Sequence, residues 1–171
     1  MNTPGITLHR LTRLVAGSLI AVSIGCADES PATGLNAQEA VASRDTIPGT
    51  GALAELQERR AAWVSRGIND YRFRLQISCF CGGDITRPVL IELRGGAIAK
   101  VWDIETRKAV ANVAAYPTIT RLFDAAIAER SRGGNVTVAY DQALGIPARL
   151  EVGTIANDAG VLYFLGNVVR L

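Results

Sequence analysis

Residues 71–79 read YRFRLQISC, a stretch in which apolar and polar side chains alternate. The apolar residues occupy the odd positions, whereas Arg72, Arg74 and Gln76 occupy even ones. Because successive side chains of a strand point to opposite faces, this period of two predicts a strand with one face in a core and the other in water. The stretch therefore predicts a sheet that is buried on one side only.

Five further strands follow from the same criteria. They are predicted at 89–94, 97–103, 136–140, 148–152 and 161–171. The pair Gly95-Gly96 between the first two is a two-residue hairpin signal. The last stretch is apolar almost throughout, which indicates a strand in the interior of the sheet.

Two helices are predicted where the apolar period lengthens to that of a helix. The first covers 52–66, with Thr50 able to cap its start and Gly67 able to end it. The second starts after Thr118 and ends at Gly133. The order α-β-β-β-α-β-β-β predicts a two-layer α+β fold, with both helices on one face of an antiparallel sheet. The repeated order hints at an internal duplication, although the residues of the two halves do not align.

The N-terminus has the features of an export signal. Residues 1–13 are basic, and 14–25 form an apolar run of twelve residues, whereas a membrane-spanning helix needs about 20. The run ends in Ser23-Ile24-Gly25-Cys26, which resembles the bacterial lipobox, although that motif usually has leucine in place of Ser23. The resemblance implies a signal peptide over 1–25 that is cleaved before a lipidated Cys26.

A polar spacer follows the lipidation site. Residues 27–50 are rich in Pro, Gly, Ser, Thr, Asp and Glu and show no sustained apolar period. Such a segment cannot bury enough surface to offset its ordering entropy. We therefore expect a lipidated cysteine and flexible tether over 26–50 and a single α+β domain over 51–171. The expected location is the cell envelope, on the extracytoplasmic side of a bacterial membrane, with the N-terminal lipid as the membrane contact.

Composition excludes several kinds of function. The chain has 18 Lys and Arg and 16 Asp and Glu, and loss of residues 1–25 leaves sixteen of each. A neutral chain without a basic block attracts phosphate backbones weakly, so we expect no nucleic-acid partner. The single histidine, His9, lies in the leader. Without it the mature chain lacks Ser-His-Asp and Cys-His chemistry and the commonest metal ligand. We expect no catalytic residue, metal or cofactor, and we favour a protein that is not an enzyme.

Cys79 and Cys81 are the sharpest local feature of the expected domain. Outside the cytoplasm two nearby thiols tend to oxidise. On a straight strand their Cα atoms would lie about 6.5–7 Å apart, at the limit of disulfide geometry, and a turn near Gly82 would bring them closer. The favoured interpretation is a structural disulfide at a strand end. Two free buried thiols or a redox pair are the alternatives, whereas a metal site is disfavoured because two thiolates need further ligands.

Arginines on the polar face of the sheet suggest a binding surface. Arg72 and Arg74 point outward, and Glu92 and Arg94 are expected beside them. With Phe80 the three arginines form the possible binding face for an anion or a partner protein. The alternative is a solvated sheet face with cross-strand ion pairs.

Two smaller groups of residues are further candidates for function. Phe80, Trp102 and Tyr116 are candidate aromatic anchors for a partner, with core packing expected for at least two of them. Asp141 and Asp158 suggest a paired-carboxylate site, but a turn role explains Asp141 better.

Short landmarks follow one another over residues 58–165. They are Trp63, Asp70-Tyr71-Arg72-Phe73, Cys79-Phe80-Cys81, Pro88-Val89, Arg94-Gly95-Gly96, Leu122-Phe123, Tyr140-Asp141 and Leu144-Gly145-Ile146-Pro147. In order and spacing they resemble a bacterial family known as a domain of unknown function, number six-one-seven-four, which often has Tyr at the position of Ile146. The resemblance implies a secreted or lipid-anchored location and supplies no reaction, cofactor or catalytic residue.

Three functional hypotheses follow. The first is a non-enzymatic, lipid-anchored envelope protein that binds another envelope component through its sheet face or loops. The second is a thiol-redox protein that uses Cys79 and Cys81. The third, an inhibitor-like module, rests on fold analogy alone.

Overall fold

The computed structural model describes residues 46–82, 84–155 and 159–171. These residues form seven strands, two α-helices and two short 3-10 turns. In chain order they are β1 (Thr46–Gly49), α1 (Leu53–Ser65), β2 (Tyr71–Ser78), η2 (Asp84–Thr86), β3 (Val89–Arg94), β4 (Ala97–Asp103), η3 (Val113–Ala115), α2 (Ile119–Ser131), β5 (Val136–Asp141), β6 (Pro147–Val152) and β7 (Val161–Arg170). None of the helices in these ranges is long and apolar enough to cross a membrane.

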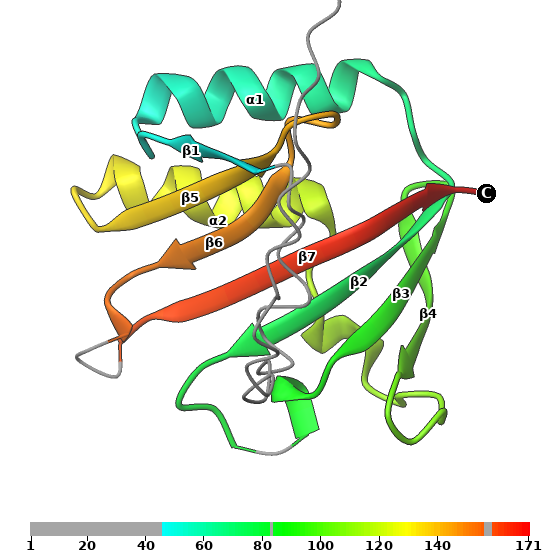
Figure 1. The fold of residues 1–171 in the computed structure, drawn as a ribbon. Coiled ribbons are helices and arrows are strands. Elements are labelled where there is room, and N and C mark those ends of the chain that lie inside the picture. The colour runs from blue at the N-terminus through cyan, green and yellow to red at the C-terminus, as the bar shows by residue number, and fades with distance from the viewer. Residues whose placement is uncertain (1–45, 83, 156–158) are drawn as a thin grey trace, which may run out of the picture. The chain divides into compact units, whose positions relative to one another are not determined.

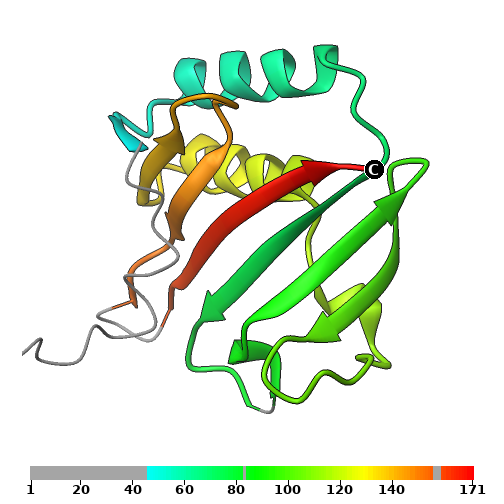
Figure 2. The same ribbon diagram turned by 45° about the vertical axis from the view of Figure 1, so that its right-hand side comes forward.

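The strands form one antiparallel sheet in the order β1-β5-β6-β7-β2-β3-β4. Both helices lie on the same face of it (Figures 1 and 2), so the predicted two-layer α+β fold is confirmed, and so is the element order from α1 onward. Each predicted block of three strands is contiguous, since β2–β4 form one meander and β5–β7 another. The two meanders join where β7 pairs with β2, which makes β7 an interior strand as expected.

The alternation in β2 produces the core. Its odd residues from Tyr71 to Ile77 are buried, and Phe73 and Leu75 are fully so. Phe73 lies opposite Ile91 of β3, and Leu75 lies opposite Leu165 of β7. Each such side chain contributes about 1.5–3 kcal/mol of hydrophobic stabilisation when buried. The even residues face away from the helices, so the sheet is buried on one side only.

The second helix follows its sequence signals closely. The Thr118 hydroxyl accepts the Arg121 N–H at 3.2 Å, which caps α2 as predicted. The predicted stripe packs into the core, and Leu122 and Phe123 are fully buried. Gly133 adopts a φ of +78° and donates its N–H to the Arg130 carbonyl at 3.0 Å, so the helix ends where expected.

Thr50 does not occupy the cap position of the first helix, in contrast to the prediction. Ala52 occupies the cap position, where it makes no side-chain cap bond. Thr50 lies two residues earlier, where its hydroxyl accepts the Ala52 N–H at 3.2 Å and donates to Glu55 at 2.6 Å. Thr50 therefore links the approaching chain to the first turn of α1. Gly67, with a φ of +60°, ends the helix as expected.

The domain begins earlier than the predicted boundary at residue 51. Thr46–Gly49, assigned to the tether, form edge strand β1, and Ile47 lies opposite Tyr140 of β5. Gly49 allows this close approach, since a Cβ there would lie 2.4 Å from the Tyr140 ring. Pro48 suits an edge strand because it has no N–H to donate. The predicted signal peptide, Cys26 and the tether up to residue 45 lie outside the described residues.

Candidate functional site

The two domain cysteines form a disulfide just beyond β2. The Cα atoms of Cys79 and Cys81 are 5.1 Å apart, closer than on a straight strand because the chain leaves β2 at Ser78. The bond encloses Phe80, whose side chain is 75% exposed. The favoured disulfide interpretation therefore agrees with the geometry, and the bond fixes an exposed aromatic residue in a short loop.

The three candidate aromatic anchors have different surroundings. Tyr116 belongs to the core, and Trp102 is half-buried on β4 beside the Lys100 ammonium, which lies 5.6 Å from its ring centroid. Of the three, Phe80 is the one that solvent reaches freely.

The sheet surface opposite the helices is rich in cations, and we call it the open face. Strand alternation places on it five cationic residues and three carboxylates: Arg72, Arg74, Arg94, Lys100 and Arg149, with Glu92, Asp141 and Glu151. Glu92 is opposite Arg72 on one side and Lys100 on the other. Because cations outnumber carboxylates, ion pairing leaves a positive excess.

The ion pairs on the open face join residues close in sequence, and their side chains are partly exposed. Arg94 Nε lies 3.0 Å from Glu92 Oε1, and Arg149 Nη2 lies 3.6 Å from Glu151 Oε2. Exposed pairs of this kind contribute about 0–1 kcal/mol. Both pairs join residues two apart on one strand, so on the described part of this face the ion pairs run along the strands and not across them as expected.

Apolar side chains interrupt the charges of the open face. Leu90 lies opposite Trp102, and Phe164 lies opposite Arg149, all on outward positions. Arginine and aromatic residues are the types enriched at protein interfaces. The open face thus combines cations with half-buried apolar groups.

The structure separates Phe80 from the predicted arginine group. Arg72 and Arg74 lie beside Glu92, and Arg94 is at the hairpin end of β3, as expected. Phe80 follows the opposite end of β2. Seven residue steps from Arg72 to Cys79 along a strand span about 23 Å. The four residues therefore do not form one compact site.

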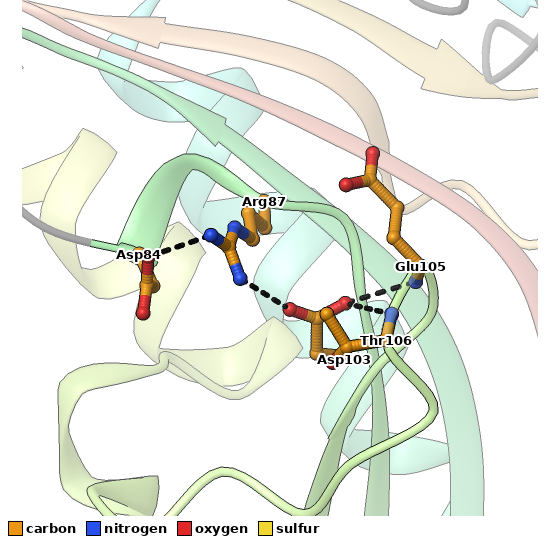
Figure 3. A network of polar contacts seen from close by, with 5 residues as sticks. All are labelled: Asp84, Arg87, Asp103, Glu105 and Thr106. Atoms are coloured by element: carbon orange, nitrogen blue, oxygen red, sulfur yellow. Dashed lines mark hydrogen bonds and ion pairs between the residues drawn. The ribbon is translucent and has the colours of Figure 1, made fainter.

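A carboxylate network that sequence reasoning missed lies at the end of β4 (Figure 3). Asp103 is 7% exposed, and its Oδ1 accepts the N–H groups of Glu105 and Thr106, each at 2.9 Å. Its Oδ2 lies 3.3 Å from Nη1 of Arg87, whose Nη2 lies 3.1 Å from Asp84. The available signal was an Asp placed before a turn, which commonly accepts N–H groups two or three residues on.

The network holds Asp103 in its ionised form. The hydrogen bond from the Thr106 backbone lowers the pKa of Asp103 most, burial opposes it, and Arg87 lowers it further. Neighbouring carboxylates, Asp103 first, raise the pKa of Arg87. A carboxylate whose charged form is so well satisfied is a poor proton donor or acceptor near neutral pH. The network is therefore a structural link between β4 and the turn before β3.

Asp141, a candidate member of a carboxylate pair, serves a turn, as the sequence predicts. Its Oδ1 accepts the Leu144 N–H at 2.7 Å, and Gly145 follows with a φ of +67°. Asp158 lies outside the described residues. Within the ranges that are described, no three His, Cys, Asp or Glu side chains gather to hold a metal ion.

Comparison with known proteins places the chain in a family. Neither the curated proteins nor the solved structures give a match. A family model described as "Family of unknown function (DUF6174)" matches residues 55–170, from the first turn of α1 to the end of β7. This span is more than half of the chain and includes the helices, the disulfide and the open face. The protein therefore belongs to the family of unknown function DUF6174.

Proposed function

We propose that this protein is a lipid-anchored, extracytoplasmic envelope protein whose domain is a non-enzymatic binding module. Its binding surface is the open face, and its partner is an envelope component that carries acidic groups. The observation that carries this proposal is the excess of five cations over three carboxylates on that face.

The charge of the domain as a whole supports the choice of surface. Residues 46–171 contain fifteen Lys and Arg and twelve Asp and Glu. The open face holds two of the three excess positive charges, so the rest of the domain is close to neutral. Complementary charge steers a partner toward such a face and fixes its orientation. Binding there is expected to weaken as salt is added.

Two features support the proposed location. The Cys79–Cys81 disulfide is the kind of bond that persists in oxidising compartments. The leader resembles a lipoprotein signal that ends at Cys26. An anchor with two or more acyl chains is effectively permanent, and it would keep the domain at the membrane surface.

The location is tested by the intact mass of the protein extracted from its native membrane. The expected result is a chain that starts at Cys26 and carries lipid mass, whereas a Cys26→Ala variant carries no lipid mass and keeps its leader uncleaved. A chain from the membrane without lipid mass would overturn the proposed anchor.

The surface is tested with a chain of residues 27–171, which lacks the leader and the lipidated cysteine, and isolated cell envelopes in a sedimentation assay. Arg72→Gln with Arg74→Gln should weaken salt-sensitive binding about tenfold or more. The matched control is Arg132→Gln, which removes an exposed arginine paired with Glu129 after α2. Equal binding by the open-face variant and the control would contradict the proposed surface.

A further inference from the structure

A cavity opens on the helix side of the domain. It has a volume of about 670 Å³ and lies between α1, the start of α2 and the β3–β4 hairpin. Trp63, Gly96 and Thr118 mark its three sides. The volume falls in the range of about 300–1,000 Å³ that is typical of small-molecule sites. The cavity is on the opposite side of the sheet from the open face.

The inner wall of the cavity is rigid and apolar. Trp63 and Tyr71, each at most 4% exposed, meet edge to face with ring centroids 5.5 Å apart. Ile68 and Ile98 extend this wall. Burial raises the pKa of Tyr71 to about 12, although a hydrogen bond from the Ile119 backbone opposes the rise. The phenol therefore stays neutral, and the wall suits an uncharged hydrophobic group.

The outer part of the cavity is cationic. Arg60 and Arg121 both line it, and none of its lining residues is acidic. Arg60 Nε lies 2.6 Å from Asp124, which is not a lining residue, and this ion pair orients the guanidinium. Thr118 and Thr120 add hydroxyl groups at the start of α2, where the helix dipole favours negative charge.

We propose that this cavity binds a small amphipathic organic anion. The apolar body of the ligand packs on Val64, Ile68 and Ile98, next to the buried Trp63 ring. Its anionic end pairs with Arg121 and with the Arg60 nitrogens that do not contact Asp124. A guanidinium fork matches a carboxylate or a phosphate, so these two head groups share the recognition chemistry. The inference is independent of the proposed binding at the open face, because the two sites have no residue in common.

Trp63 provides a direct readout for this proposal. The chain has two tryptophans, and Trp102→Phe in the chain of residues 27–171 leaves Trp63 as the reporter. Octanoate and octyl phosphate should each cause a saturable change in Trp63 fluorescence. Octanol has the body without the charge, and acetate has the charge without the body. Both should bind at least tenfold more weakly than octanoate.

Arginine variants tie the binding to the cavity. Arg121→Gln should weaken octanoate binding about tenfold or more, and Arg121→Lys should retain part of it. Arg149→Gln on the open face is the matched control and should bind octanoate normally. Circular dichroism of each variant checks that the fold is intact. Binding of octyl phosphate alone would assign the site to phosphate-bearing ligands.

Three results would overturn the proposal: no saturable signal with either anion, equal binding of octanol, or normal binding by a folded Arg121→Gln variant. The envelope sedimentation assay does not depend on this cavity. A failure here therefore leaves the open-face result unchanged, and the two proposals can fail separately.

Discussion

Oδ2 of Asp103 lies 3.3 Å from Nη1 of Arg87, which ties the last residue of β4 to the turn before β3. The Ile104 N–H donates to the Pro88 carbonyl at 3.0 Å beside this pair. Two further backbone N–H groups satisfy the other carboxylate oxygen. Removing the carboxylate would leave these donors without an acceptor in a nearly buried position. An unsatisfied buried donor costs more free energy than the removal of both partners of a hydrogen bond.

The first prediction concerns the pH dependence of stability. The pKa of Asp103 is lower in the folded protein than its ordinary value near 4. Its stabilisation is therefore fully present above about pH 4 and is lost as pH falls through the folded pKa. Asp103→Asn should lower stability near neutral pH and flatten the acid limb of the stability profile. Urea unfolding between pH 2 and 7 measures both effects.

Asp124→Asn is the matched control for Asp103→Asn. It removes an ion-paired but exposed carboxylate, and such pairs contribute about 0–1 kcal/mol. If both variants lose stability equally at every pH, the Asp103 network does not have the role assigned to it.

The second prediction separates a structural disulfide from a redox pair. Cys79→Ser with Cys81→Ser opens a ring of three residues, so the chain-entropy estimate is a loss of about 1–2 kcal/mol. Envelope binding should be unchanged, and the wild-type chain should not turn over a test dithiol. Phe80→Ser keeps the disulfide and is the control for the loop. Dithiol turnover that disappears in the double variant would favour the thiol-redox hypothesis.

The third prediction uses two neighbours on opposite faces of β2. Phe73 is fully buried, and Phe73→Ala should cost about 3–5 kcal/mol. Arg72 is exposed on the open face, and Arg72→Ala should change stability by no more than about 0.5 kcal/mol. Denaturant unfolding of the two variants gives the comparison directly. Similar losses would mean that the sheet is not buried on one side only.

The sequence predicts most of this fold because its signals are local. The alternation around Phe73, the cap at Thr118 and the glycine at 133 each depend on residues a few positions apart, and the structure agrees with them. The turn role of Asp141 is local in the same sense.

The features that the sequence did not predict are contacts between residues far apart in the chain, or elements too short to show a periodic pattern. Arg60 and Arg121 are far apart in sequence and meet only because α1 packs beside α2. Arg87 and Asp103 meet because β3 and β4 pair. Phe80 is near Arg72 in sequence, yet an extended strand puts them at opposite ends.

Strand β1 shows what decides such a short element, and it yields the last prediction. Gly49 is the position at which β1 approaches β5 most closely, since an added Cβ would lie 2.4 Å from the Tyr140 ring and 2.7 Å from Val138. Tyr140 is fully buried and its ring cannot turn away into solvent. Gly49→Ala should therefore strain or detach β1, at a cost of about 1–3 kcal/mol in urea unfolding.

Gly82→Ala is the control for Gly49→Ala, because a Cβ at Gly82 meets nothing within 4 Å. Its stability should stay close to that of the wild type. A chain without residues 46–49 should lose about as much stability as Gly49→Ala, since both act by removing β1 from the sheet. Equal stability of the two glycine variants would mean that residues 46–49 belong to the tether and not to the folded domain. A large difference would instead show that the strand belongs to the fold, because the backbone pairing of four residues depends on one glycine that lets them reach Tyr140.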